Sequence, residues 1–230
     1  MSFTSNDTLK KLEKLLPESI HNQSVPKDIL GIIDEYIPKL NDKNIHDVVY
    51  QYYFSDDKNT KQQIINNYGP INEWDVSQVT NMKELCRSKR NFNEDISNWN
   101  VSNVKNMEGM FEDAKNFNQP LGNWNVSNVR RMEEMFYYAD SFNQPLNNWN
   151  VSNVKNMEGM FDDAECFNQP LNNWDVSNVT NMDNMFNNSY SFNNSLNNWN
   201  VSNVTTMEGM FYETLSFNMQ VNAPWYHGDN

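Results

Sequence analysis

The sequence has few cysteines, few glycines and no long apolar run. Its 230 residues include 2 Cys and 7 Gly. Cys86 and Cys166 fall at different places in a 25-residue repeat, three repeats apart, so we expect no disulfide between them. No apolar stretch approaches the ~20 residues of a membrane span, and the first residues lack the apolar core of a signal peptide. We therefore expect an intracellular, cytoplasmic chain with no membrane contact.

Positive charge is also scarce, and the shortage is uneven along the chain. The sequence has 17 Lys and Arg against 30 Asp and Glu, a formal net charge of −13. Residues 1–70 hold 8 basic and 10 acidic side chains, whereas residues 71–230 hold 9 and 20. A surface this acidic repels phosphates, so we expect no nucleic-acid partner. A basic protein surface is the expected electrostatic complement.

The residue types that enzymes and metal sites use are sparse. The three histidines, His21, His46 and His227, are far apart and lie outside the repeats. No Cys/His spacing fits a zinc site, and no glycine-rich phosphate loop is present. We expect no enzymatic activity, no bound metal and no cofactor.

The sequence contains instead a 25-residue repeat in strict register. Six copies without insertion predict a stack of equal coils, a solenoid. We expect an N-terminal helical head and cap at 1–70, the repeats at 71–223, and a C-terminal tail at 224–230. The tryptophan of each copy stands at Trp74, Trp99, Trp124, Trp149, Trp174 and Trp199.

The residues before the repeats predict short helices. Apolar spacing typical of helices occurs at 8–16, 25–37, 44–54 and 60–67, with Pro17 and Pro38 ending the first two. The last helix is expected to cover the apolar end of the first coil, because repeat stacks need such caps. The segment 25–37, Val-Pro-Lys-Asp-Ile-Leu-Gly-Ile-Ile-Asp-Glu-Tyr-Ile, also resembles the opening helix of an F-box, the head of ubiquitin-ligase substrate receptors.

Each repeat alternates two apolar periods. The pattern L-x-x-W-N-V predicts a short strand, and V-x-x-M-x-x-M-F-x-x-A predicts one face of a helix. The expected fold is therefore an α/β repeat solenoid with one short parallel strand and one helix per 25 residues. We expect the Met, Trp and Phe columns to form its core, and the Asn columns starting at Asn103 and Asn118 to satisfy backbone groups in the turns.

These motifs resemble a known family. L-x-x-W-x-V resembles the strand core of leucine-rich repeats. M-F-x-x-A-x-x-F-N-Q-P-L-x-x-W-N-V-S-N-V-x-x-M resembles the bacterial lipoprotein-associated repeat of BspA-like leucine-rich-repeat proteins, over about 150 residues. The resemblance implies a leucine-rich-repeat solenoid that binds proteins. Similar repeats occur in large DNA viruses, which implies a host-cell cytoplasmic or virion location if the chain is viral.

Two surfaces are candidate partner-binding sites. On the predicted helix side, columns vary between coils and place tyrosines beside acids, as protein interfaces often do. The predicted strand side is the face that leucine-rich repeats often use. The candidate residues are Glu112, Asp113, Tyr137, Tyr138, Asp162, Asp163 and Tyr212 on the helix side, and Asp75, Asn100, Asn125, Asn150 and Asp175 on the strand side.

The expected function is a non-catalytic protein-binding repeat module with a protein partner, for which a basic surface is the electrostatic complement. One alternative is an F-box-like ubiquitin-ligase substrate adaptor. Another is a structural or virion-associated protein that self-associates through the ends of its solenoid, because every coil offers a strand edge if its caps fail.

Overall fold

A computed structural model describes residues 39–55 and 57–228. The chain divides into two compact units, Met1–Pro38 and Lys39–Asn230. All described residues belong to the second unit. The helices predicted at 8–16 and 25–37, including the F-box-like segment, lie outside the described residues. The predicted ranges of head, repeats and tail stay a prediction.

Two helices precede the repeats, and both were predicted from the sequence. Helix α3 spans Ile45–Phe54 and α4 spans Lys58–Tyr68. Asp57 caps the start of α4, because its side chain accepts the backbone N–H groups of Asn59 and Thr60. Gly69, with φ of 80°, ends the helix. The 3₁₀ turn η2, Ile71–Glu73, leads into the first coil. The residues that α3 buries are Ile45, Val48, Val49 and Tyr52, which share one face of the helix.

The first coil is covered by α3 and by the turn before it. Asp42 in that turn accepts the Thr80 N–H at 2.7 Å. On α3, Nε2 of His46 lies 2.8 Å from the Lys83 carbonyl oxygen. In the following coils, the N–H group equivalent to that of Thr80 donates to the previous coil, and the carbonyl equivalent to that of Lys83 accepts a bond from the previous coil. The helix thus replaces a missing coil, as a cap must.

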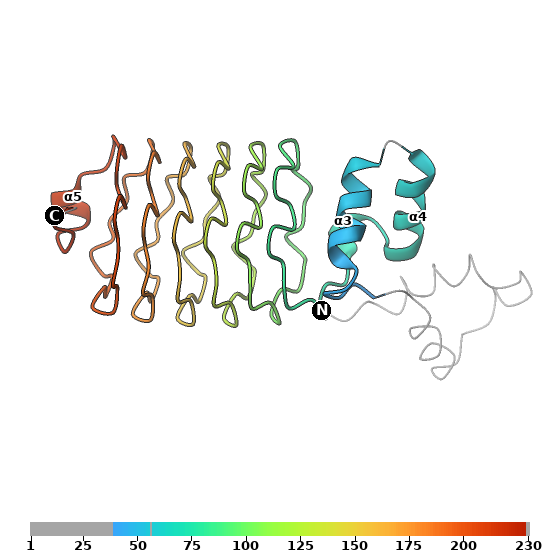
Figure 1. Ribbon diagram of the computed structural model, residues 1–230, viewed down its shortest axis with the longest axis horizontal. Coiled ribbons are helices and arrows are strands. Elements are labelled where there is room, and N and C mark those ends of the chain that lie inside the picture. Colours follow the sequence, from blue (N-terminus) through green and yellow to red (C-terminus); the bar gives the residue numbers. More distant parts are fainter. Residues whose placement is uncertain (1–38, 56, 229–230) are drawn as a thin grey trace, which may run out of the picture. The chain divides into compact units, whose positions relative to one another are not determined.

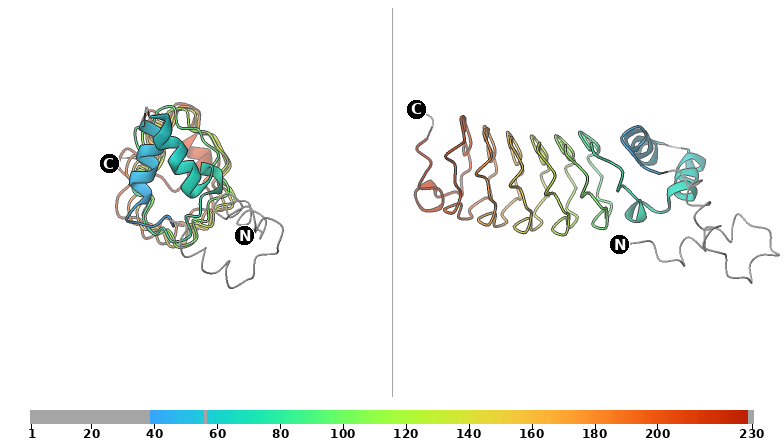
Figure 2. Two further views of the ribbon diagram at one scale, coloured as in Figure 1. Left: turned by 90° about the vertical axis from the view of Figure 1, so that its right-hand side faces the viewer. Right: turned by 90° about the horizontal axis from the view of Figure 1, so that it is seen from below.

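The repeats form a stack of 25-residue coils (Figure 1). Viewed along the stack, successive coils overlie one another (Figure 2, left). Single parallel bridges join residues 25 positions apart at one point of each coil. These bridges are Asn81↔Asn106, Asn106↔Arg131, Arg131↔Asn156, Asn156↔Asn181 and Asn181↔Thr206. The short helix α5, Met219–Asn222, follows the last coil.

The predicted leucine-rich-repeat fold, an α/β solenoid with one strand and one helix per repeat, is wrong. From residue 74 to residue 218, all of which the structure describes, the chain has no helix and no strand beyond the single bridges. The bridges also lie outside the segment predicted as strand. Both predicted elements are replaced by turns.

The segment predicted as helix is a run of tight turns. The Met110 N–H donates to the Met107 carbonyl three residues back, and the same turn recurs four residues later. The third residue of each turn, Gly109 and then Asp113, has φ of 57° and 53°. A right-handed helix excludes this conformation, and type II turns require it. The helix-like apolar spacing arises because each turn returns the chain to the interior after three or four residues.

The remaining N–H groups of this segment bond to the next coil. Alternate residues from 107 to 113 donate to carbonyls 24 positions later, as Gly109 does to Glu133 at 2.8 Å. A helix would use all these N–H groups internally; here half of them hold a neighbouring coil. All of these bonds point the same way. The segment therefore presents donors toward the C-terminal side of the stack and acceptors toward the N-terminal side.

The segment predicted as strand is turned as well. The Trp149 and Val154 N–H groups each donate to a carbonyl three residues back. Asn150 accepts the N–H of Ser152 and fixes the turn between them. The Trp149 indole Nε1 donates to the carbonyl of Leu121 in the previous coil at 2.9 Å. Side chains therefore make much of the connection here.

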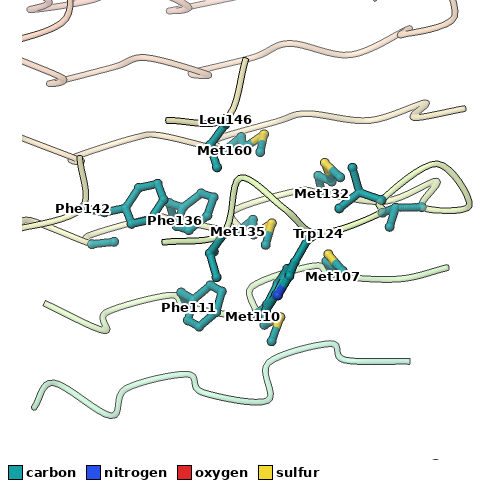
Figure 3. Packing of buried hydrophobic residues seen from close by; sticks show 14 of the residues in the cluster. Met107, Met110, Phe111, Trp124, Met132, Met135, Phe136, Phe142, Leu146 and Met160 are labelled. Atoms are coloured by element: carbon teal, nitrogen blue, oxygen red, sulfur yellow. The ribbon is translucent and has the colours of Figure 1, made fainter. Parts of the chain in front are cut away.

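The core lies inside the coils, and the predicted core columns are confirmed. Figure 3 shows Phe111, Phe136 and their methionine neighbours packed together from successive coils. The Phe136 ring stacks on those of Phe111 and Phe161, with both centroid distances 5.6 Å. In the interior coils the Met and Phe columns are fully buried and the tryptophans nearly so. Stacking identical side chains buries each one against its own copy.

The predicted asparagine ladders are also confirmed. The Nδ2 group of Asn128 donates to the Ser102 carbonyl of the previous coil at 2.7 Å. In the second column, Oδ1 of Asn118 accepts the Asn143 N–H at 3.0 Å and the Gln144 amide at 2.9 Å. These contacts recur through the stack and satisfy backbone groups that no regular sheet pairs.

Candidate protein-binding surfaces

We call the surface formed by the run of tight turns, residues 106–116 and their equivalents at 25-residue steps, the turn face. All the candidates of the predicted helix side lie on it. The structure places Glu112, Tyr137, Asp162 and Tyr212 in one column, and Asp113, Tyr138 and Asp163 in the adjacent column. The residues of the adjacent column, Asp113, Tyr138 and Asp163, have positive φ. The N–H group of each donates to a carbonyl of the next coil.

A tyrosine pair lies near the middle of the turn face. The Tyr137 and Tyr138 rings are 4.4 Å apart, and Tyr138 is 39% exposed. The Lys115 ammonium lies 5.6 Å from the centre of the Tyr138 ring. Burial, and then a hydrogen bond with Tyr138, raises the pKa of Tyr137. Tyr212, three coils further on, is 62% exposed and is separate from this pair.

The next coil places two carboxyls beside the tyrosines. Asp162 is half-buried, and its Oδ1 atom has no hydrogen-bond partner among the described residues. Burial, and then the charge of Asp163, raises the pKa of Asp162 to about 7. Glu112, in the same column two coils earlier, also has a raised pKa, chiefly because of burial, with Arg87 opposing the shift. Residues 39–55 and 57–228 contain no group of three or more His, Cys, Asp or Glu able to hold a metal ion.

In the first coils, basic side chains neutralise the acids of the turn face. Lys83 lies 2.9 Å from a Glu108 oxygen, and Arg87 lies 2.9 Å from Glu112. Arg131 bridges Glu108 and Glu133 at 2.6 and 2.9 Å. These acids are therefore already paired within the chain.

The later coils have no such basic side chains. No Lys or Arg follows Lys155 in the sequence, and the Lys155 ammonium donates to Asn178. The acids on this part of the turn face are Glu158, Asp162, Asp163, Glu165, Asp183, Glu208 and Glu213. Sequence reasoning missed this asymmetry because it compared only 1–70 with 71–230. A count of basic residues coil by coil would have found it.

The candidates of the predicted strand side form an exposed row on a separate segment of each coil. In every copy the Oδ1 atom accepts the N–H of the serine two residues on, at 3.0–3.2 Å. Bonds from the Ser177 hydroxyl and N–H lower the pKa of Asp175. One oxygen of each side chain is therefore occupied in stabilising its own turn. The row is Asp75, Asn100, Asn125, Asn150 and Asp175.

Within the part of the chain that the structure describes, no helix is both long and apolar enough to cross a membrane.

Comparison with family models assigns the chain to a family. It matches the model of the family described as "Mycoplasma protein of unknown function, DUF285" over residues 48–171 and 145–227. The chain belongs to this family. The matched ranges include most of α3, α4 and every coil. No curated protein matches the chain, and no solved structure does.

This match corrects the resemblance drawn from the repeat motif. The matching family is described neither as BspA-like nor as leucine-rich-repeat. The spacing L-x-x-W-x-V suggested a leucine-rich-repeat strand, but in the structure those residues lie in turns. The spacing is typical of any coil that directs Leu, Trp and Val inward, and so it does not by itself specify a strand.

Proposed function

We propose that the chain is a non-catalytic protein-binding module whose turn face binds a basic segment of a partner protein. The observation that carries this proposal is the change along the turn face, where acids are paired with Lys and Arg in the first coils and have none beside them after Lys155. Unpaired surface acids attract a basic partner and steer its approach. Exposed tyrosines beside them supply contact area that an interface can bury.

The turn face has stronger support than the row of the predicted strand side. Side-chain oxygens of that row already accept bonds from their own turns. The row also has only two acids, Asp75 and Asp175, among otherwise neutral asparagines. Its residues vary little from coil to coil, whereas several columns of the turn face change residue type along the stack, as from Glu112 through Tyr137 to Asp162.

A matched pair of variants of the full chain tests the proposal. The first, Asp162→Asn with Asp163→Asn, gives one coil the residues that the next coil has, Asn187 and Asn188. The second, Asp75→Asn with Asp175→Asn, gives the row the residue that its other copies have. Each variant replaces two carboxyls with amides of the same shape, so both should fold. At about pH 8, above the pKa of Asp162, each variant removes two negative charges. Immobilised wild-type chain and both variants are exposed to cell lysate, and the retained proteins are compared by quantitative mass spectrometry.

We expect the wild-type chain to retain basic proteins that elute as salt is raised. The turn-face variant should retain several-fold less of them, and the row variant about as much as wild type. Equal losses in both variants would mean that net charge alone attracts the proteins. A loss only in the row variant would move the binding surface to the predicted strand side.

The ubiquitin-ligase adaptor role rests on residues 25–37, outside the described residues, and stays a prediction. The structural or virion-associated role likewise stays a prediction.

We also propose that the chain works in a reducing compartment, the cytoplasm. The support is its two free thiols, of which Cys166 is exposed and Cys86 is buried, with a pKa that burial raises to about 12.

A further inference from the structure

The last coil is less completely covered than the coils before it. α5 and the residues after it cover only one part of this end. Ala223 is fully buried there, Trp225 stacks on Trp199 at 6.3 Å, and Tyr226 packs edge-on against Phe211 at 5.1 Å. Val176, Val179 and Met182 of the preceding coil are at most 1% exposed, whereas their equivalents Val201, Val204 and Met207 are only partly buried.

Three backbone donors of the last coil also meet no acceptor in the part of the chain that the structure describes. In the preceding coil, the N–H groups of Met182, Phe186 and Asn188 donate to carbonyls of the last coil at 2.9–3.0 Å. No acceptor among the described residues meets the equivalent N–H groups of Met207, Phe211 and Glu213. We call residues 201–215 the open end. It presents these three N–H groups, the partly buried valines and methionine named above, Leu215 at 79% exposure, and the acids Glu208 and Glu213.

The direction of these bonds argues against pairing between two copies of the chain. Two open ends facing each other would set donors against donors. The acceptor side of a coil is available only at the first coil, and there α3 covers it, with His46 at the Lys83 carbonyl. The acceptors that fit the open end are therefore the backbone carbonyls of a segment other than a second open end.

We propose that the open end binds an extended, basic peptide segment of a partner protein. In an extended chain the carbonyls on one edge recur every second residue, which matches donors at Phe211 and Glu213. Alternate apolar side chains of the peptide cover Val201, Val204 and Met207, as a further coil would. Basic side chains between them meet Glu208 and Glu213. This inference rests on the proposed function but places a peptide site at the end of the stack, apart from the tyrosine pair.

Backbone NMR of the ¹⁵N-labelled full chain tests this site. The probe is an acetylated, amidated eight-residue peptide of alternating Lys and Val. We expect its addition to shift the amide signals of Met207, Phe211 and Glu213 and to slow hydrogen exchange at Met207 and Glu213 about tenfold. The amides of Met182, Phe186 and Asn188 are internal controls that should not change. A peptide of alternating Glu and Val should bind at least about fivefold more weakly.

A matched pair of variants checks the location. Leu215→Lys adds a positive charge at the open end, and Tyr190→Lys adds the same charge in the same column one coil earlier, where the side chain is 37% exposed. We expect Leu215→Lys to weaken binding of the Lys–Val peptide about fivefold or more, and Tyr190→Lys to change it less than about twofold.

Three results would overturn the inference. Shifts confined to the turn face around Tyr137 and Asp162 would leave the proposed function standing without a site at the open end. Shifts of the Met207 and Glu213 amides that grow with protein concentration, without peptide, would identify a second copy as the occupant. No shift anywhere would remove the peptide site, while the lysate comparison would still decide the proposed function by itself.

Discussion

The two halves of each coil are held to their neighbours in different ways. In the half that contains the tryptophan, indole and asparagine side chains donate back to carbonyls of the previous coil. In the half that contains the tight turns, backbone N–H groups donate forward to the next coil. A substitution in the first half can therefore remove a connection between coils directly. In the second half most connections are backbone bonds, so a substitution there acts mainly through backbone conformation or charge.

The largest expected effect is in the tryptophan half. Trp149→Ala removes a ring that is 3% exposed and its bond to the Leu121 carbonyl. We expect the free energy of unfolding to fall by about 3–5 kcal/mol, because the change leaves a cavity and removes one of the two hydrogen bonds that the Leu121 carbonyl accepts. Urea denaturation measures the loss. Tyr212→Ala, at an exposed position, serves as the control and should change stability little; an unchanged midpoint for Trp149→Ala would contradict the comparison.

The next effect is in the turn half and acts through the backbone. Gly159 has φ of 57°, and its N–H donates to the Asp183 carbonyl at 2.8 Å. Gly159→Val places a β-branched residue in this conformation and should cost about 1–2 kcal/mol. Gly159→Asn should cost less than half as much, because Asn184 adopts φ of 54° at the same position. Equal costs for the two variants in thermal unfolding would show that the positive φ does not matter.

A pH dependence should follow from the same half. The pKa of Asp162 is about 7 in the folded chain against 3.8 for an ordinary Asp. The folded state then holds the proton more tightly, so the free energy of unfolding falls as pH rises from about 4 through 7. The carboxyl is only partly buried, so solvent screening reduces the expected loss to about 1 kcal/mol. Urea midpoints at about pH 5.5 and pH 8 measure it.

Asp162→Asn should reduce this difference between the two pH values and stabilise the chain at the higher one. Asp175→Asn is the control. The pKa of Asp175 is lowered rather than raised, so its titration lies below this pH range. A larger pH dependence in Asp162→Asn than in wild type would reverse the assigned sign.

The smallest effect is the loss of one side-chain connection in the tryptophan half. Asn153→Ala removes an exposed bond of 2.7 Å to the Ser127 carbonyl. We expect a loss of about 0.5–1 kcal/mol by urea denaturation. Asn148→Ala is the matched control, because Asn148 is exposed and makes no hydrogen bond with any described residue. A loss as large as that of Trp149→Ala would mean that the ladder, rather than the ring, carries the connection.

Much of the interior was predictable from the sequence. The buried columns were predicted because a constant 25-residue period places each residue type against its own copy. The helices α3 and α4 were predicted because local apolar spacing and capping residues suffice for short helices. Secondary structure within the coils was not predictable in the same way. The spacing of the apolar residues shows which side chains are buried. Turns can produce this spacing, just as strands and helices can. The glycines Gly109, Gly159 and Gly209 at one column were the available sign of positive φ.

The candidate surfaces were predicted in part. Tyrosines and acids that vary from coil to coil were recognised as a group, and the structure places them on one run of turns. The open end was not predictable. The same Val, Val and Met pattern occurs in the last coil as in the others, and its burial depends on what lies beyond it.

The sequence by itself determined the length of each coil and which side chains are buried, because both follow from a repeated apolar pattern. Only the tertiary structure decided where the N–H groups of each coil bond. A carbonyl four residues back, as in a helix, and one 24 residues later are both chemically suitable acceptors. Stacked coils supply the distant acceptor wherever another described coil follows; in the last described coil, the N–H groups of Met207, Phe211 and Glu213 meet no acceptor among the described residues.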